Sequence, residues 1–168
     1  MCIRDSQLTA AAFLEEREAT LNEMFPTAQL MPGAARLVRH LRAHGVPIAV
    51  ATSSHRRHFE LKTTLHGELF ALFDHVITGD AVSQGKPHPE IFQTAAARFA
   101  SPPAAPGDVL VFEDAPSGVQ AAVAAGMRVV CVPDPRLDLA MVGGASAVIS
   151  SLEAFAPEAF GLPPFADA

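Results

Sequence analysis

Short apolar runs alternate with helical patterns along most of this chain, which is typical of a parallel α/β sheet. The runs are interpreted as buried strands because they are short and are bounded by turn residues. Gly45 and Gly126 stand where glycine commonly ends a helix. The expected strands are Val46–Ala51, His75–Thr78, Val109–Phe112, a run from Arg128 and an edge strand within residues 146–150, and the expected helices cover residues 34–44, 55–65, 89–99 and 117–125.

The two ends of the chain depart from this pattern. Residues Leu8–Phe25 have helical spacing and acidic character, and the segment FPTAQLMPG separates them from the rest of the chain. The C-terminal segment EAFGLPPFADA is rich in proline and is expected to lie along the surface. The pattern therefore predicts a short N-terminal helical segment and a larger α/β unit.

Polar side chains follow three of the expected strands. The first strand ends in Thr52-Ser53-Ser54, the loop after the second carries Lys86 within GKPHPEIF, and the third ends in Glu113-Asp114. Sheets of this class bind ligands at the carboxyl ends of their strands. Hydroxyl groups, a lysine and paired carboxylates are the ingredients of a phosphate site with Mg²⁺.

Each of these signals also has a simpler interpretation. Asp114 can be a favourable negative charge at a helix N-terminus, Thr52 an ordinary helix cap, and Lys86 a solvated surface lysine. The basic residues 55–58 could meet a substrate anion, although a solvated helix face is the interpretation that we favour. Only the combination of the three signals indicates a phosphate site.

Composition narrows the possible classes of protein. The formal net charge of −6 argues against a general nucleic-acid surface. No apolar run approaches the roughly 18 residues of a membrane span, and charges throughout the first twenty residues indicate no signal peptide. Cys2 and Cys131 form no disulfide framework or zinc spacing, so Cys131 is expected in the core of a protein from a reducing, cytoplasmic compartment.

Three segments resemble motifs of the haloacid dehalogenase superfamily of phosphatases. VATSS is similar to the second motif, GKPHPEIF to the third and VFEDAPSGVQAAVAAGM to the fourth, in the order and spacing of that family. The likeness covers residues 25–165 and is closest to the branch of pseudouridine-5′-phosphatases and plant glycerol-3-phosphatases. Each motif alone is a weak signal, whereas the set is specific.

The resemblance implies a fold, a cofactor and roles for the polar residues. The fold would be a three-layer α/β/α, Rossmann-like core with a mostly parallel sheet. The intact enzyme would form and hydrolyse an aspartyl-phosphate, with Mg²⁺ at the phosphate. Asp114, with Glu113 directly or through water, would hold the Mg²⁺. The Thr52 hydroxyl and the Ser53 amide would bind the phosphate, and Lys86 would neutralise it.

The chain also departs from the family. The first motif, D-x-D-G-T, supplies the nucleophile, and no D-x-D occurs in this sequence. The family places that strand between Val46–Ala51 and Val109–Phe112, so we expect a gap there with unpaired backbone on both sides. Residues 1–28 would be the remnant of a helical cap, with residues 1–6 suspected to be artefactual, and residues 29–168 would be the hydrolase core. This N-terminally truncated chain is predicted to be inactive alone.

The predicted function is Mg²⁺-dependent hydrolysis of a small phosphomonoester such as pseudouridine 5′-phosphate or glycerol 3-phosphate. A phosphomutase similar to β-phosphoglucomutase and a catalytically dead phosphate-binding remnant are the alternatives. The expected partner is a phosphorylated metabolite, with no nucleic acid and no membrane, and the full-length protein is expected to be a monomer.

Overall fold

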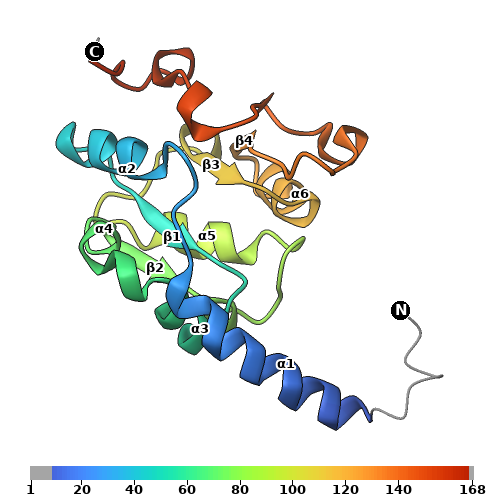
Figure 1. Cartoon of the computed structure of the whole chain (residues 1–168). Coiled ribbons are helices and arrows are strands. Elements are labelled where there is room, and N and C mark those ends of the chain that lie inside the picture. The colour runs from blue at the N-terminus through green and yellow to red at the C-terminus, as the bar shows by residue number, and fades with distance from the viewer. Residues whose placement is uncertain (1–8, 167–168) are drawn as a thin grey trace.

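The computed structural model describes residues 9–166, and it is an α/β structure in which every paired strand runs parallel to its neighbour (Figure 1). The strands are β1 (Ala49–Ala51), β2 (His75–Ile77), β3 (Leu110–Glu113), β4 (Arg128–Cys131) and β5 (Ala147–Val148). The α-helices are α1 (Ala10–Met24), α2 (Ala34–Ala43), α3 (Arg56–Lys62), α4 (Gly67–Phe70), α5 (Glu90–Ala97) and α6 (Pro116–Ala124). The predicted fold class is therefore confirmed.

The strands belong to two separate sheets. β1 pairs with β2, and a second sheet has the order β3-β4-β5. Within residues 9–166 no strand joins β1 to β3, so the expected gap in the sheet is present between these two strands.

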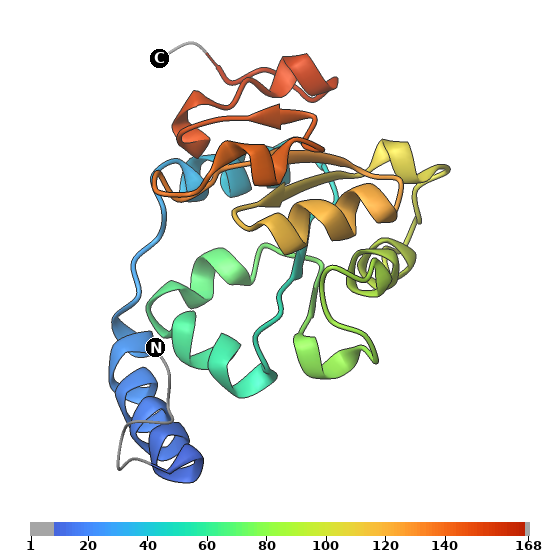
Figure 2. The same cartoon turned by 90° about the vertical axis from the view of Figure 1, so that its right-hand side faces the viewer.

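Helices and the C-terminal segment cover opposite faces of the strands (Figure 2). α5 and α6 pack on one face, where the apolar core includes Ile77, Ile91 and Val129. α2 lies on the other face with the C-terminal segment, and its core is centred on Leu37 and Leu41. The layers are therefore helix, sheet and helix, as the resemblance implied.

The C-terminal segment lies along the surface as predicted, but it also supplies part of the core on the α2 face. Phe160, Leu162 and Phe165 pack against that core. The Pro163 carbonyl oxygen lies 2.8 Å from Nε2 of His40, on α2. The segment therefore holds α2 against the sheet.

Most expected elements are present, although α3 and α5 are shorter than the expected helices 55–65 and 89–99, and there are two further differences. The first strand begins at Ala49 instead of Val46, because Pro47 has no N–H and the Ile48 N–H donates to the side chain of Asp74 at 2.9 Å. The short helix α4 occupies a segment for which no helix was expected. Cys131 is fully buried, so its predicted place in the core is confirmed.

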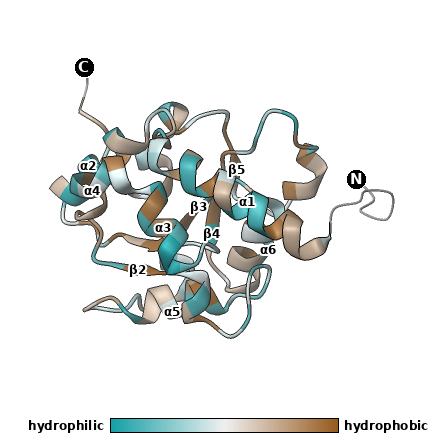
Figure 3. Cartoon of the chain, turned by 60° about the horizontal axis from the view of Figure 1, so that its bottom comes forward, coloured by the Kyte–Doolittle hydropathy of each residue, from teal (hydrophilic) through white to brown (hydrophobic). Residues whose placement is uncertain are grey.

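α1 projects away from the α/β layers and has no buried residue (Figure 1). Hydrophilic residues are distributed along it, whereas the strands are hydrophobic (Figure 3). The proposed remnant character of residues 1–28 stays a prediction, and residues 1–6 lie outside the described part of the chain. No helix within residues 9–166 is both long and apolar enough to cross a bilayer.

Candidate active site

The side chain of Lys86 contacts the carboxyl ends of both β1 and β3. Its ammonium donates to the carbonyl oxygen of Ala51 at 3.0 Å and forms an ion pair with the carboxylate of Glu113. Both side chains are buried, at 9% and 8% exposure. The ammonium also lies 4.7 Å from the ring centre of Phe92. Lys86 is therefore held in place, unlike the solvated surface lysine of the simpler interpretation.

The loop after β1 places the predicted phosphate-binding residues directly beside this lysine contact. The N–H of Ser54 donates to the hydroxyl oxygen of Thr52 at 3.1 Å, which leaves the hydroxyl proton of Thr52 available for another acceptor. Ser53 is exposed at the turn of the loop. The loop therefore presents a hydroxyl donor and backbone toward solvent at the edge of β1.

Gly79 supports this loop, a role that the sequence interpretation missed. Its N–H donates to the carbonyl oxygen of Ser54 at 3.0 Å. A Cβ atom at Gly79 would lie 2.4 Å from the carbonyl oxygen of Ser53, closer than real Cβ atoms approach. Only glycine therefore lets the two backbones come this close, and the signal in the sequence was a glycine directly after a strand.

Glu113 and Asp114 have different surroundings although they are adjacent. The carboxylate of Glu113 pairs with Lys86 and fills the space beside Gly118, where a Cβ atom would lie 2.0 Å from Oε2. Asp114 is exposed at the edge of the sheet. Burial, followed by the negative charges of Asp114 and Glu113, raises the pKa of the nearby Cys131 thiol. The two acids therefore add negative potential at the carboxyl end of β3.

Glu90 organises the loop that leads to Lys86, and sequence reasoning gave it no role. Its carboxylate accepts hydrogen bonds from the N–H and hydroxyl of Ser83, both at 2.8 Å, and from the N–H of Gln84 at 2.9 Å. These bonds, led by the Ser83 N–H, lower the pKa of Glu90. The glutamate of the GKPHPEIF segment therefore fixes the backbone just before the lysine.

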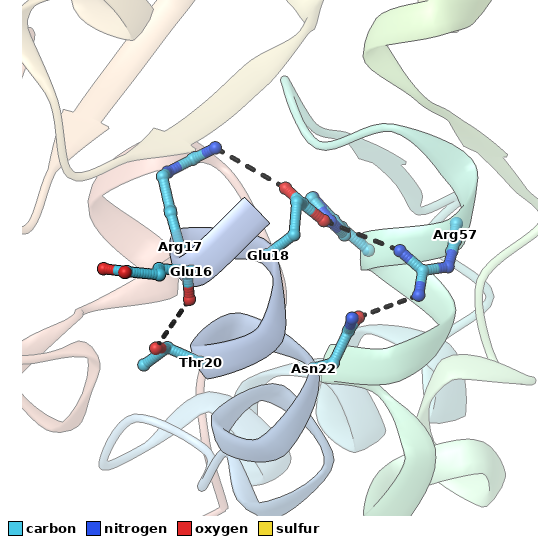
Figure 4. Close-up of polar contacts among 7 residues, drawn as sticks. Glu16, Arg17, Glu18, Thr20, Asn22 and Arg57 are labelled. Atoms are coloured by element: carbon cyan, nitrogen blue, oxygen red, sulfur yellow. Dashed lines mark hydrogen bonds and ion pairs between the residues drawn. The ribbon is translucent and has the colours of Figure 1, made fainter. Parts of the chain in front are cut away.

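Two of the four basic residues at positions 55–58 are engaged by α1. Arg57 donates to Asn22 at 2.9 Å and pairs with Glu18 at 3.6 Å, so its side chain is directed to α1 (Figure 4). His58 contacts Glu18 at 2.9 Å. For these two residues, the structure agrees better with a helix face than with a substrate site. The face is not simply solvated, however, because it contacts α1.

A magnesium ion requires hard oxygen ligands and commonly takes one or two carboxylates, with phosphate and water completing the shell. Within residues 9–166 no group of three or more histidine, cysteine or acidic residues is arranged to hold a metal. Asp114 has the chemistry and exposure for such a ligand, whereas the carboxylate of Glu113 is engaged by Lys86. The residues therefore fit an ion bound mainly by substrate, water and Asp114, and direct binding by Glu113 stays a prediction.

The structure thus brings the buried lysine and the hydroxyl-bearing loop to the carboxyl end of β1, and the exposed carboxylate to the carboxyl end of β3. That these residues bind a phosphorylated ligand stays a prediction. A family model described as "haloacid dehalogenase-like hydrolase" matches residues 4–126. The chain belongs to this family of hydrolases.

Several known proteins are similar to the chain. It is 55% identical over 167 residues to (DL)-glycerol-3-phosphatase 2 of Arabidopsis thaliana, covering 98% of this chain and 69% of that protein. It is 51% identical to a probable pseudouridine-5′-phosphatase of Drosophila melanogaster, covering 92% of this chain and 68% of that protein. The chain thus spans a little over two thirds of each relative, and the resemblance to this phosphatase branch is confirmed.

The fold also matches solved structures. A HAD family hydrolase from Deinococcus radiodurans R1, solved with bound phosphate and sodium, superposes with a TM-score of 0.75 at 30% identity. The match covers 90% of this chain and 69% of that one. Most of this chain therefore has the fold of that hydrolase.

Proposed function

We propose that this chain is the larger part of a Mg²⁺-dependent phosphomonoester hydrolase that acts on a small phosphorylated metabolite. The observation that supports this most directly is the position of Lys86, whose buried ammonium lies between the ends of β1 and β3. A phosphate bound there would contact the hydroxyl of Thr52 and the ammonium of Lys86, and it would lie near the carboxylate of Asp114.

In the proposed reaction, the residues of this chain bind and orient the phosphate. The Thr52 hydroxyl donates to one phosphate oxygen while its own oxygen accepts from Ser54, so the donor direction is fixed. The amide of Ser53 adds a second donor. Lys86 neutralises charge that builds up on the phosphate during transfer, and Glu113 holds the ammonium in that position.

Asp114 would hold the Mg²⁺ together with substrate and water, with Glu113 acting directly or through water. The ion would supply charge stabilisation at the phosphate when bound. In the protein, Asp114 directly follows Glu113, the partner of Lys86, and its carboxylate is exposed.

The nucleophilic aspartate would come from a segment that is not among these 168 residues. Glu113 is unsuited to that role because its carboxylate is buried against Lys86 and Gly118. Asp80 is also engaged, since it accepts the N–H of Arg56 at 3.2 Å. We therefore expect the chain alone to bind phosphate weakly and to release none from a phosphomonoester.

The identity of the substrate is proposed from the relatives. Similarity is high to a glycerol-3-phosphatase, and a probable pseudouridine-5′-phosphatase follows closely. A phosphomutase is the second candidate, supported by a putative β-phosphoglucomutase from Thermotoga maritima that superposes with a TM-score of 0.65 at 29% identity. A remnant that only binds phosphate is the third.

Phosphate release from glycerol 3-phosphate and pseudouridine 5′-phosphate, with and without EDTA, tests the proposal. The assay compares the chain alone with the chain joined to the N-terminal segment of a full-length relative. We expect turnover only for the joined protein, and only without EDTA. Conversion of a sugar 1-phosphate without phosphate release would favour the mutase.

Variants of the joined protein separate the proposed roles. Asp114→Asn should weaken Mg²⁺ binding, so that more Mg²⁺ is needed for turnover, and Lys86→Ala should mainly lower kcat. Thr52→Ala should cost less, because one neutral hydrogen bond contributes only about 0.5–1.5 kcal/mol. EDTA-sensitive turnover by the unextended chain would contradict the proposed external nucleophile.

A further inference from the structure

Lys62, the last residue of α3, has an ammonium group that is held by a hydroxyl and an aromatic ring. Its Nζ donates to Oγ of Ser54 at 3.0 Å and lies 4.4 Å from the ring centre of Phe25. Within residues 9–166 no carboxylate lies close enough to this half-buried lysine to form an ion pair with it. The position of the ammonium therefore depends on its contacts with Ser54 and Phe25.

The contact with Ser54 connects Lys62 to the loop that the proposed function assigns to phosphate. We call residues 52–54 the phosphate loop. The N–H of Ser54 donates to the hydroxyl oxygen of Thr52 at 3.1 Å, and its carbonyl oxygen accepts from the N–H of Gly79 at 3.0 Å. Ser54 is thus bonded through its amide, its carbonyl and its hydroxyl, and Lys62 supplies the third of these bonds.

The chemistry of the ammonium determines how the Ser54 hydroxyl is used. An ammonium carries only donors, so Oγ of Ser54 must accept from it. Hydrogen bonds from a charged donor are stronger than those from a neutral one. A fixed Ser54 holds its own N–H in place, and that N–H occupies the oxygen of Thr52. Lys62 therefore acts on the Thr52 hydroxyl through Ser54.

Phe25 supplies the second contact of the ammonium, from the base of α1. It opens the short 3-10 helix η2 (Phe25–Thr27), which directly follows α1. Its ring packs edge-on against the ring of His58, with 5.2 Å between the ring centres, and His58 contacts Glu18 of α1 at 2.9 Å. An ammonium over an aromatic face is attracted to it, most strongly where water is excluded. The base of α1 thus helps to hold Lys62 in position.

We propose that Lys62 is a positioning residue for the phosphate loop. Its ammonium, held by Phe25, bonds Ser54 and thereby fixes the direction in which the Thr52 hydroxyl donates to a bound phosphate. Lys62 acts through Ser54 and is not expected to contact the substrate itself. The consequence for phosphate binding rests on the proposed function, whereas the effect of Lys62 on Ser54 does not.

Amide hydrogen exchange in the 168-residue chain, followed by NMR, tests the effect on Ser54. The reporter is the Ser54 N–H, whose exchange is slowed by its hydrogen bond to Thr52. Lys62→Met removes the charged donor but keeps an unbranched side chain, and we expect exchange at Ser54 to become about three- to tenfold faster. Lys62→Arg keeps a charged donor and should restore most of the protection.

Titration with inorganic phosphate tests the effect on binding, with the amide shifts of Thr52 and Ser53 as the readout. We expect Lys62→Met to raise the Kd about three- to tenfold. Arg57→Met is the matched control, because it removes one positive charge from the same helix, but from a side chain that is directed to α1. At physiological ionic strength it should change the Kd by less than about twofold.

A double-mutant cycle separates positioning from a direct effect of charge. In a chain that carries Ser54→Ala, the ammonium has lost its hydroxyl acceptor, so Lys62→Met should have no further effect on the Kd. A direct attraction between the ammonium and phosphate would persist in that background. Phe25→Leu keeps an apolar side chain but removes the aromatic face, and it should cause a smaller loss of the same kind.

Two outcomes would overturn the proposal. The first is unchanged exchange at position 54 in a Lys62→Met chain whose β4 amides stay protected. The second is an effect of Lys62→Met on the Kd that is as large with Ser54→Ala as without it.

Ser54→Ala keeps the exchange test decisive if Lys62→Met does not fold. It removes the same hydrogen bond from the other partner and should accelerate exchange at position 54 to a similar extent. Unchanged exchange in Ser54→Ala would also overturn the proposal. If the native chain binds no phosphate, the proposed phosphate site fails, whereas the exchange measurements still decide the role of Lys62.

Discussion

β1 and β4 have nearly the same kind of sequence but very different surroundings. Both are short and apolar on successive residues, which is typical of a parallel strand covered on both faces. In β4, Val129, Val130 and Cys131 are fully buried, whereas all three residues of β1 are only half-buried. β4 has a strand on each side, and β1 is paired on one side only.

This difference shows that the burial of a sheet strand depends on its neighbours as much as on its own residues. The helices α2 and α5 lie over β1, but a cavity lined by residues of β1 and β3 leaves the second edge of β1 without a neighbouring strand. We therefore expect the β1–β2 sheet to be less stable than the β3-β4-β5 sheet. Substitutions should test this difference in stability. The largest losses of unfolding free energy are expected in the strands, and the smallest effect is a pH response of α1.

A charge introduced into each strand should separate the two halves most strongly. Val129→Asp puts a carboxylate at a position with no solvent exposure and should cost about 4 kcal/mol or more. Val50→Asp, in half-buried β1, should cost about 1–2 kcal/mol because the carboxylate can reach water. NMR spectra recorded in a urea series give the unfolding free energy of each variant residue by residue. Equal losses would show that β1 is as well packed as β4.

Lys86 is a polar link between the two halves, and its removal should have the next largest effect. Lys86→Met leaves the buried carboxylate of Glu113 without its partner, for which the expected cost is about 3–5 kcal/mol. The double variant Lys86→Met/Glu113→Met removes both charges and should be less destabilised than Lys86→Met. Urea unfolding of these two proteins, the native chain and Glu113→Met gives the coupling energy. An additive double variant would mean that the ion pair contributes nothing.

Gly118 tests how tightly the carboxyl end of β3 is packed. A Cβ atom there would lie 2.0 Å from Oε2 of Glu113, so Gly118→Ala must displace the carboxylate that Lys86 holds. We expect a loss of about 1–3 kcal/mol despite the higher helix propensity of alanine. Gly107→Ala is the control, since nothing lies within 4 Å of the new Cβ atom. Thermal unfolding that is unchanged in Gly118→Ala would contradict this packing.

The contact of α1 with α3 should respond to pH, with the smallest effect. The hydrogen bond from His58 lowers the pKa of Glu18 from its ordinary value of 4.5. A carboxylate with a lowered pKa stabilises the folded contact above pH 4.5, and this stabilisation is lost as the pH falls through the lowered pKa. Acidification below pH 4.5 should therefore increase amide exchange in α1, but not in β4.

Glu18→Gln is the control for this pH effect. It removes the titrating group, so exchange in α1 should become nearly independent of pH over the same range once intrinsic exchange rates are corrected. The pH dependence would have another source if the variant kept the response of the native chain.

The order of the elements could be predicted from the sequence because it depends on local patterns. Helix α2 ends before Gly45, which adopts a positive φ of 70°, and the bounds of β3 and α6 differ from the expected ones by one residue at each end. The start of β1 could not be predicted, since it depends on the side chain of Asp74 reaching back to the backbone of Ile48 from another segment. Such a contact leaves no mark in the local pattern.

The candidate site divides in the same way. Its residue types could be read from the chain, because Thr52, Lys86 and Asp114 each follow a strand and strand ends gather at one edge of a parallel sheet. The contacts of each group required the folded molecule, in which Glu113 is the ion-pair partner of Lys86. Likewise, only the packed layers direct the arginine at position 57 to α1. Side-chain partners come from distant segments, and their choice depends on the space and charge that remain once the layers have packed.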